Sequence, residues 1–197
     1  EEFTGIEVNV DEDGMKLPDV TDDFSEGSDA GDTTSDEENS SEDGVLISSL
    51  FYLGADKYPD GEEEVDHNIY GITQDSEVLN GLLSMGLTSG GKTITYESDG
   101  TTLTAATADN SVFTLTITDT ETGAWAFDLQ DQLDHVAPPA DPGYDENTTL
   151  QGLGGSDIDL SSVLTASDFD GDTVTGAAEG SFLVNVTEDI PAIPLVP

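Results

Sequence analysis

The chain of 197 residues is extremely acidic, with 44 Asp and Glu residues against 3 Lys and Arg and a formal net charge of −41. Three basic side chains cannot neutralise a nucleic-acid backbone or an anionic lipid surface, so both are excluded as partners. Neighbouring carboxylates repel by about 1 kcal/mol per close pair even in water. We therefore expect divalent cations or high salt to stabilise the compact state.

Length and composition further limit the class of protein. The length fits one domain of ordinary size, with or without a disordered arm. The chain contains no cysteine, which leaves its compartment open, and no apolar run is long enough to span a membrane. It opens on Glu-Glu-Phe without a signal peptide, and we expect it to be a piece of a longer protein.

The two ends of the chain carry a similar pattern. Residues 8–13 (VNVDED) recur as residues 184–189 (VNVTED), an offset of 184 − 8 = 176 residues. In each copy an alternating apolar strand runs into acidic residues. This predicts that residues 1–13 are the last strand and linker of a preceding module, 14–186 one β-sandwich module, and 187–197 a linker to the next module in a tandem array. Chance similarity of two short strand ends is the alternative.

Two acidic segments and one apolar run follow. Residues 19–44 consist almost entirely of Asp, Glu, Ser, Gly and Thr, a composition that cannot bury enough surface to order itself, so we expect a mobile acidic loop. The apolar run 45–53 (VLISSLFYL) resembles a strand, and residues 58–68 form a second acidic loop.

A single short helix is expected after residue 75. Asp75 or Ser76 can cap its first turn and Gly86 can end it. The apolar residues that would share its buried face are Val78, Leu79, Leu82 and Leu83.

From residue 93 onward the pattern is that of strands. Residues 93–104 read as a hairpin with a turn at 98–100. Residues 111–118 alternate without a break, and another strand follows the turn at 119–123. The residues expected on the buried faces are Phe113, Leu115, Ile117, Trp125, Phe127 and Leu129. We therefore predict an all-β fold: an antiparallel β-sandwich of the immunoglobulin or cadherin type with one short helix.

A calcium site is predicted at residues 168–172 (DFDGD). Asp168, Asp170 and Asp172 alternate, and Gly171 allows the backbone to bend, so one loop offers the hard oxygen ligands that calcium prefers. An EF-hand is not expected, because Thr173 stands where that loop requires glycine and both flanks resemble strands. A solvated acidic turn is the alternative.

Several motifs together resemble the large repeat of type I secretion target proteins, the bacterial RTX adhesins. The motifs are residues 125–135 (WAFDLQDQLDH), a Pro/Gly-rich loop that ends at Glu146-Asn147, the DFDGD loop, a closing strand and an acidic proline linker. The hairpin at 99–104 followed by 112–115 is similar to theirs as well. The resemblance covers about residues 11–190. Two departures stand out: residues 19–43 are unusually rich in acids and serine, and Thr187 replaces an acid that its counterpart Asp11 keeps.

The resemblance implies a calcium-stabilised extender module of a cell-surface adhesin, secreted through a type I system, active in cell adhesion and biofilms, and displayed outside the cell. Its partners would be calcium ions and neighbouring modules of the same chain, without membrane insertion, and the isolated piece would be a monomer. Calcium would stiffen the linkers, and the DFDGD loop could share an ion with them. The candidate ligands are Asp11, Glu12, Asp13, Asp134, Glu146, Asp168, Asp170, Asp172, Glu188 and Asp189; Asp134 could equally cap a turn.

Other functions have less support in the sequence. A ligand-binding module that recognises carbohydrate or protein is the alternative, because aromatic residues gather near acidic loops; they are Phe51, Tyr52, Tyr58 and Tyr70. His67 and His135 are far apart in sequence, and His135 beside Asp134 is expected to be a structural turn residue. No nucleophile motif is present, so we do not expect an enzyme.

Overall fold

The computed structural model describes residues 5–12, 38–40, 45–53, 69–137, 146–168 and 170–189. Most of the elements in these residues are strands, arranged in several sheets with one short α-helix, in agreement with the predicted all-β class. Within the described part of the chain, no helix has the length and apolarity needed to cross a membrane.

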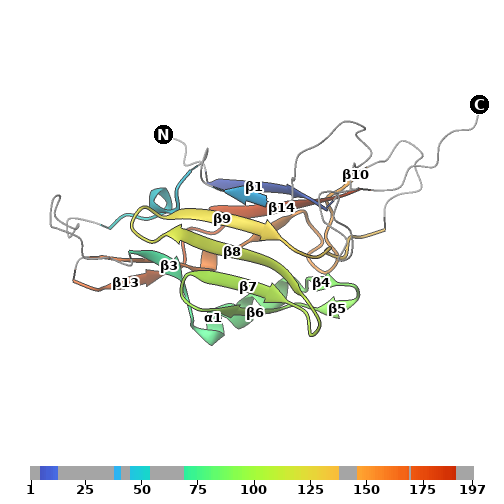
Figure 1. Ribbon diagram of the computed structural model, residues 1–197, viewed down its shortest axis with the longest axis horizontal. Helices are drawn as coiled ribbons and strands as arrows, with labels where there is room; N and C mark the ends of the chain where they lie inside the picture. Colours follow the sequence, from blue (N-terminus) through green and yellow to red (C-terminus); the bar gives the residue numbers. More distant parts are fainter. Residues whose placement is uncertain are drawn as a thin grey trace, which may run out of the picture.

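The largest sheet is an antiparallel meander of four consecutive strands with a short fifth strand at one edge (Figure 1). Its strand order is β2-β9-β8-β7-β6. Its strands are β2 (Glu38–Ser40), β6 (Thr95–Ser98), β7 (Thr102–Ala106), β8 (Ser111–Asp119) and β9 (Ala124–Leu129). The hairpin and the two strands predicted after residue 93 are confirmed, because alternation is a local signal. Residues 38–40 lie inside the expected acidic loop 19–44 yet pair with β9; the rest of that loop, like residues 58–68, lies outside the described residues.

A second sheet joins the two ends of the described chain. Its central strand is β14 (Phe182–Asp189), which has β1 (Ile6–Asp11) on one edge. Its other edge carries β10 (Glu146–Asn147) and β11 (Asp157–Asp159), both antiparallel. The pair β1–β14 is parallel, so both strands run toward the same end of the molecule (Figure 1).

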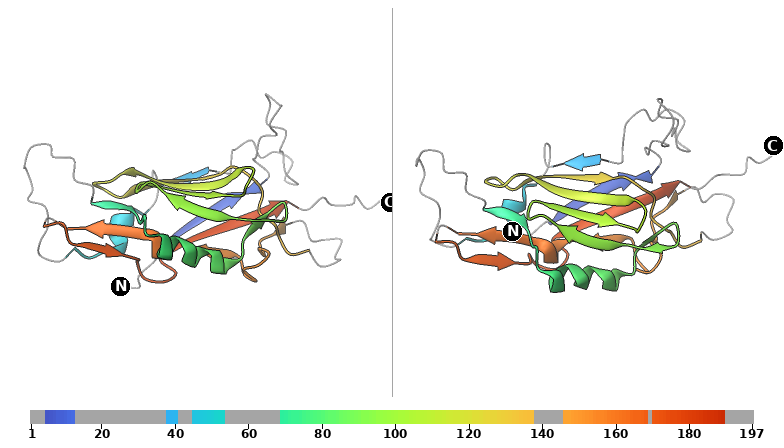
Figure 2. Two further views of the ribbon diagram at one scale, coloured as in Figure 1. Left: turned by 90° about the horizontal axis from the view of Figure 1, so that it is seen from below. Right: turned by 60° about the horizontal axis from the view of Figure 1, so that its bottom comes forward.

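Smaller elements complete the layers (Figure 2). One antiparallel sheet has the order β13-β12-β3, and a separate hairpin joins β4 to β5. The strands are β3 (Tyr70–Ile72), β4 (Thr88–Ser89), β5 (Lys92–Thr93), β12 (Leu164–Ser167) and β13 (Thr173–Thr175). The helical elements are α1 (Ser76–Gly81) and the 3-10 helices η2 (Ile47–Leu50), η3 (Leu82–Met85) and η4 (Ser161–Val163).

The core lies between the meander and the sheet of β1 and β14. Trp125 of β9 meets Phe182 of β14 in an edge-on contact with ring centroids 5.2 Å apart. Phe113 and Phe127 pack on neighbouring strands at 5.3 Å. Full burial of one large apolar side chain contributes roughly 1.5–3 kcal/mol to the free energy of folding. The inward-facing side chains of the two sheets therefore hold the sheets together.

Helix α1 begins as the sequence predicts. The Asp75 carboxylate accepts a hydrogen bond from the Glu77 N–H at 2.8 Å, which satisfies one of the free donors of the first turn. Leu79 and Leu82 are buried and Val78 is half-buried, but Leu83 is exposed, so it does not lie on the buried face as expected. The last turn tightens into η3 and ends at Gly86 in the left-handed conformation.

The strand expected in the apolar run 45–53 is wrong, because residues 47–50 form the 3-10 helix η2. Contacts outside the run decide its shape: the Trp125 indole N–H donates to the Val45 carbonyl at 2.9 Å, and the Ile47 N–H donates to the Gly123 carbonyl at 2.9 Å. Within the run Ile47 is fully buried, whereas Tyr52 is 90% exposed.

The similarity of the two chain ends has a structural explanation other than a module repeat. The two copies are β1 and β14 themselves, paired in register, with Val8 beside Val184 and Val10 beside Val186. Parallel neighbours in one sheet face the same layers, so both need the same alternation of buried and outward side chains. The first strand therefore packs in the same core as β14 rather than in a preceding module as expected. On its other side β14 pairs with β10 and β11, and the tandem array of modules stays a prediction.

Candidate functional site

The first acidic cluster is the loop between β12 and β13, with Asp168, Asp170 and Asp172 (the aspartate loop). The Asp168 carboxylate accepts a hydrogen bond from the Asp172 N–H at 2.9 Å, and the Asp168 N–H donates to the Asp172 carbonyl at 3.0 Å. Gly171 has a φ of +89°, a conformation that favours glycine. One carboxylate oxygen from each of the three aspartates lies within 4.8 Å of the others.

The aspartate loop has the composition of a weak cation site. Asp168 is half-buried and the other two aspartates are exposed. Three carboxylates supply part of the six to eight oxygens that calcium takes, and exposed acids repel each other less than buried ones. The loop lies between strands, as predicted, and its geometry allows a metal ion without requiring one.

The second acidic cluster is at the opposite end, where β14 finishes (Figure 1). A pocket of about 370 Å³ opens there. We name four of its acids and its histidine the exit cluster: Glu12, Asp131, Asp134, His135 and Glu188, all of which line the pocket.

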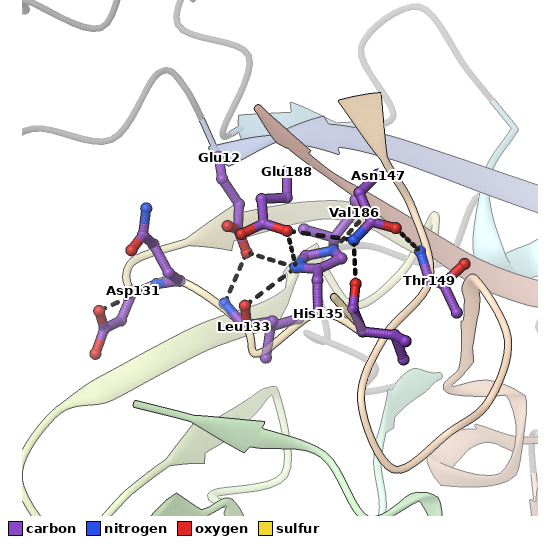
Figure 3. Close-up of polar contacts among 10 residues, drawn as sticks. Glu12, Asp131, Leu133, His135, Asn147, Thr149, Val186 and Glu188 are labelled. Atoms are coloured by element: carbon purple, nitrogen blue, oxygen red, sulfur yellow. Dashed lines mark hydrogen bonds and ion pairs between the residues drawn. The ribbon is translucent and has the colours of Figure 1, made fainter. Parts of the chain in front are cut away.

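Glu12 is the buried acid of the exit cluster (Figure 3). Its side chain is 3% exposed, and its carboxylate accepts a hydrogen bond from the Leu133 N–H at 2.7 Å. Burial raises the pKa of Glu12 to about 8; the Leu133 N–H opposes this shift, whereas the charges of Glu188, Asp11 and Asp131 add to it. With its pKa raised this far, Glu12 keeps its proton at neutral pH.

His135 is the side chain between the strand ends. Its ring is 1% exposed, with Nδ1 3.9 Å from a carboxylate oxygen of Glu12 and 3.8 Å from one of Glu188. Nδ1 also lies 3.1 Å from the Leu133 carbonyl oxygen, and Nε2 lies 3.3 Å from the Val186 carbonyl oxygen on β14. The imidazole thus joins the loop after β9 to β14.

Asn147 of β10 completes the polar contacts at this end (Figure 3). Its side chain is buried and donates to the Val136 carbonyl at 2.7 Å and to the Glu188 carboxylate at 3.3 Å. Its own carbonyl accepts from the Thr149 N–H at 3.1 Å. Four chain segments therefore meet in one hydrogen-bonded group.

The structure separates the predicted ligands into two groups. Glu12, Asp134 and Glu188 meet in the exit cluster; the Asp134 carboxylate accepts from the Gly91 N–H at 2.8 Å, which is the turn-stabilising role kept open above. Glu146 lies opposite Asp189 in the backbone pairing of β10 with β14, at the same end. Asp11 is the last residue of β1, and Asp13 lies outside the described residues. The aspartate loop is at the other end (Figure 1), so the expectation that it shares an ion with residues 11–13 is wrong.

The sequence predicts a structural role for His135 but not its distant partners, and it indicates no role for Asn147. No local pattern marks a histidine that contacts residues about 50 and 120 positions away. The signal that the sequence offered for a buried histidine was the run Leu133-Asp134-His135, which follows a strand and begins with an apolar residue.

The aromatic residues of the alternative ligand-binding function do not gather on the surface of the described residues. Tyr70 is buried and packs against Phe51 at 6.3 Å, and Tyr52 is exposed. Tyr58 lies outside the described residues.

Comparisons with family models, curated proteins and solved structures found no match for the chain.

Proposed function

We propose that this chain is a calcium-stabilised structural extender module of a secreted bacterial surface adhesin of the RTX type. In this role the module is a spacer that holds distal binding domains away from the cell. It performs no chemistry.

The observation that carries the proposal is the path of the chain between two acidic ends. Because β1 and β14 are parallel neighbours, the chain enters the second sheet at one end of the molecule and leaves it at the other (Figure 1). A spacer requires this path, since its length adds to the distance between its neighbours only if entry and exit are opposite. The aspartate loop joins β12 to β13 at the entry end, and the exit cluster lies at the exit end, where β14 finishes (Figure 1).

Charge supports a role for calcium. A net charge of −41 with 3 basic residues destabilises any compact state through self-repulsion. Calcium bound by Asp168, Asp170 and Asp172 would neutralise part of this charge at the entry end. Extracellular sites of this type bind calcium with dissociation constants of about 10⁻⁴ to 10⁻³ M. Display outside the cell after type I secretion, with neighbouring modules as partners, belongs to the same proposal.

The finer fold assignment is also proposed. Two facing sheets with a Trp–Phe contact between them are compatible with an immunoglobulin- or cadherin-like β-sandwich.

The test is a thermal melt of the full chain in EDTA and across a calcium titration, with magnesium and sodium chloride at matched ionic strength. Calcium at 100 times its dissociation constant should stabilise the fold by about 2.7 kcal/mol, which for a chain of this size raises Tm by about 5–10 °C. The sodium chloride series should not reproduce this shift.

A matched pair of variants locates the effect. Replacing Asp168, Asp170 and Asp172 by Asn should remove the calcium response. Replacing the exposed residues Glu7, Glu97 and Glu179 by Gln removes the same charge elsewhere and should leave the response intact. If salt stabilises as well as calcium, or if both variants respond like the parent chain, the aspartates are only a solvated turn.

A further inference from the structure

A groove of about 410 Å³ lies between the helical segment of α1 and η3 and the strand β11 with its flanking loops. We name it the helix groove. Helix α1 contacts η4, which follows β11 in the chain, so the two walls of the groove pack against each other (Figure 2). None of the lining residues belongs to the aspartate loop or to the exit cluster, so the groove is a separate feature.

The lining of the helix groove is largely apolar. Its apolar residues are the buried Leu82 and the half-buried Val78, Met85 and Leu153. The loop that carries Leu153 is fixed against the end of η3, because a Cβ on Gly152 would collide with the Gly86 carbonyl oxygen. A methionine side chain is flexible and polarizable, so Met85 can adapt to apolar groups of different shape. The groove therefore has room and partners for an apolar side chain.

Two aspartates of β11 form an acidic edge of the groove. Asp157 and Asp159 are separated by the fully buried Ile158, so both lie on the opposite face of the strand, with Cα atoms about 7 Å apart. The Asp157 carboxylate accepts from the Asn185 amide at 3.2 Å, and the Asp159 carboxylate accepts from the Gly180 N–H at 2.9 Å. These neutral donors hold the carboxylates in place without compensating their charge.

We propose that the helix groove is a docking site for a segment of another protein that presents one apolar side chain next to Lys or Arg. The apolar side chain enters the groove between Met85 and Leu153, and the basic side chain pairs with Asp157. The module then carries a binding surface on its side in addition to acting as a spacer. The inference goes beyond the proposed function and does not depend on calcium, so the two succeed or fail separately.

Charge and composition select this occupant. A second copy of the chain brings 3 basic residues against 44 acids, and like charges across an interface repel. The same repulsion disfavours anionic ligands. No lining residue of the groove is aromatic, so a sugar ring finds no aromatic face to stack on. The only Lys or Arg of the described residues, Lys92, pairs with Asp109, so a basic partner is what Asp157 and Asp159 lack.

The test titrates the full chain, labelled with ¹⁵N, with a capped synthetic peptide that has one leucine followed by two lysines between glycine and serine flanks. Salt at about 0.15 M limits unspecific attraction by the charge of the chain. We expect a dissociation constant on the order of 1 mM, because so short a peptide buries little area. The largest changes in chemical shift should fall on the amides of residues 78–85 and 153–159, which surround the groove.

Two control peptides separate the apolar contact from the charge. Replacing the leucine by glycine should weaken binding at least about tenfold, because the burial of the leucine is lost. Replacing both lysines by glutamates should abolish binding. If the peptide without leucine binds as well, or if the shift changes spread over the whole acidic surface, the attraction is only electrostatic and the proposal falls. It falls equally if no binding is detected at about 10 mM peptide.

Two variants of the chain locate the site. Asp157→Asn keeps the shape of the side chain and should weaken binding of the leucine–lysine peptide about two- to fivefold, as expected for an exposed ion pair. Glu97→Gln removes the same charge from an exposed position on β6 that does not line the groove, and it should leave binding unchanged. Equal effects of the two substitutions would overturn the assignment of the peptide to the helix groove.

Discussion

Replacing Val8 by Ala tests whether the first strand belongs to this fold. Val8 is 0% exposed and lies beside Val184, which is also 0% exposed, in the parallel pair of β1 and β14. Removing two buried methyl groups costs about 0.8 kcal/mol each in transfer free energy, and the cavity left behind adds to this. We therefore expect Val8→Ala to lower the free energy of unfolding by about 2 kcal/mol.

Val184→Ala is the matched control, because the same substitution at the paired position of β14 removes the same atoms from the same layer. Urea denaturation of the parent chain and both variants, followed by Trp125 fluorescence, gives the two differences in midpoint at constant slope. Trp125 lies in the core against Phe182 and so reports on the packing of the two sheets.

The structure requires losses of similar size at the two positions. If residues 1–13 were instead the end of a preceding module, Val8 would be exposed in this chain, and its replacement would change stability by less than about 0.5 kcal/mol. A neutral Val8→Ala together with a costly Val184→Ala would refute the pairing of β1 with β14.

Three further predictions concern single residues. Because the pKa of Glu12 is raised from 4.5 to about 8, the folded chain keeps a proton that the unfolded chain releases between these pH values. The contribution of protonated Glu12 to the free energy of unfolding is fully present below pH 4.5 and is lost as the pH rises to 8, by up to about 5 kcal/mol. Urea midpoints measured in EDTA should therefore fall over this range, and a flat profile would contradict the burial of this acid. Asp75→Ala should cost about 1 kcal/mol through loss of the helix cap, while Asp75→Asn should cost little, and equal losses would show that the cap is not the cause. Gly152→Ala would place a Cβ against the Gly86 carbonyl oxygen, so the Tm of this variant should fall well below that of the control Gly154→Ala. Gly154 also has a positive φ, but no atom lies within 4 Å of the Cβ that would be added there. Similar Tm values for the two variants would exclude the close approach of Gly152 to Gly86.

The local features of this protein could be predicted from its sequence. Alternation over residues 111–118 and 125–129 placed the buried faces of β8 and β9 correctly, because the side-chain period of a strand is a property of the strand itself. The start of α1 was predicted because Asp75 contacts an N–H two residues away. The aspartate loop was predicted for the same reason, since its three carboxylates lie within five consecutive residues of the chain.

Tertiary structure decided the remaining features. The sequence contained the VNV pattern twice but did not show that the two copies are neighbours in one sheet, because pairing depends on how residues 12–181 between the two strands fold. The shape of residues 45–53 depends on contacts with Trp125 and Gly123. The burial of Glu12 and its position beside His135 likewise arise only when β1, β14 and the loop after β9 meet. Composition and short-range periodicity thus determined the all-β class and the acidic loop, whereas the partners of each strand and each buried charge were set by long-range packing, which no local pattern records.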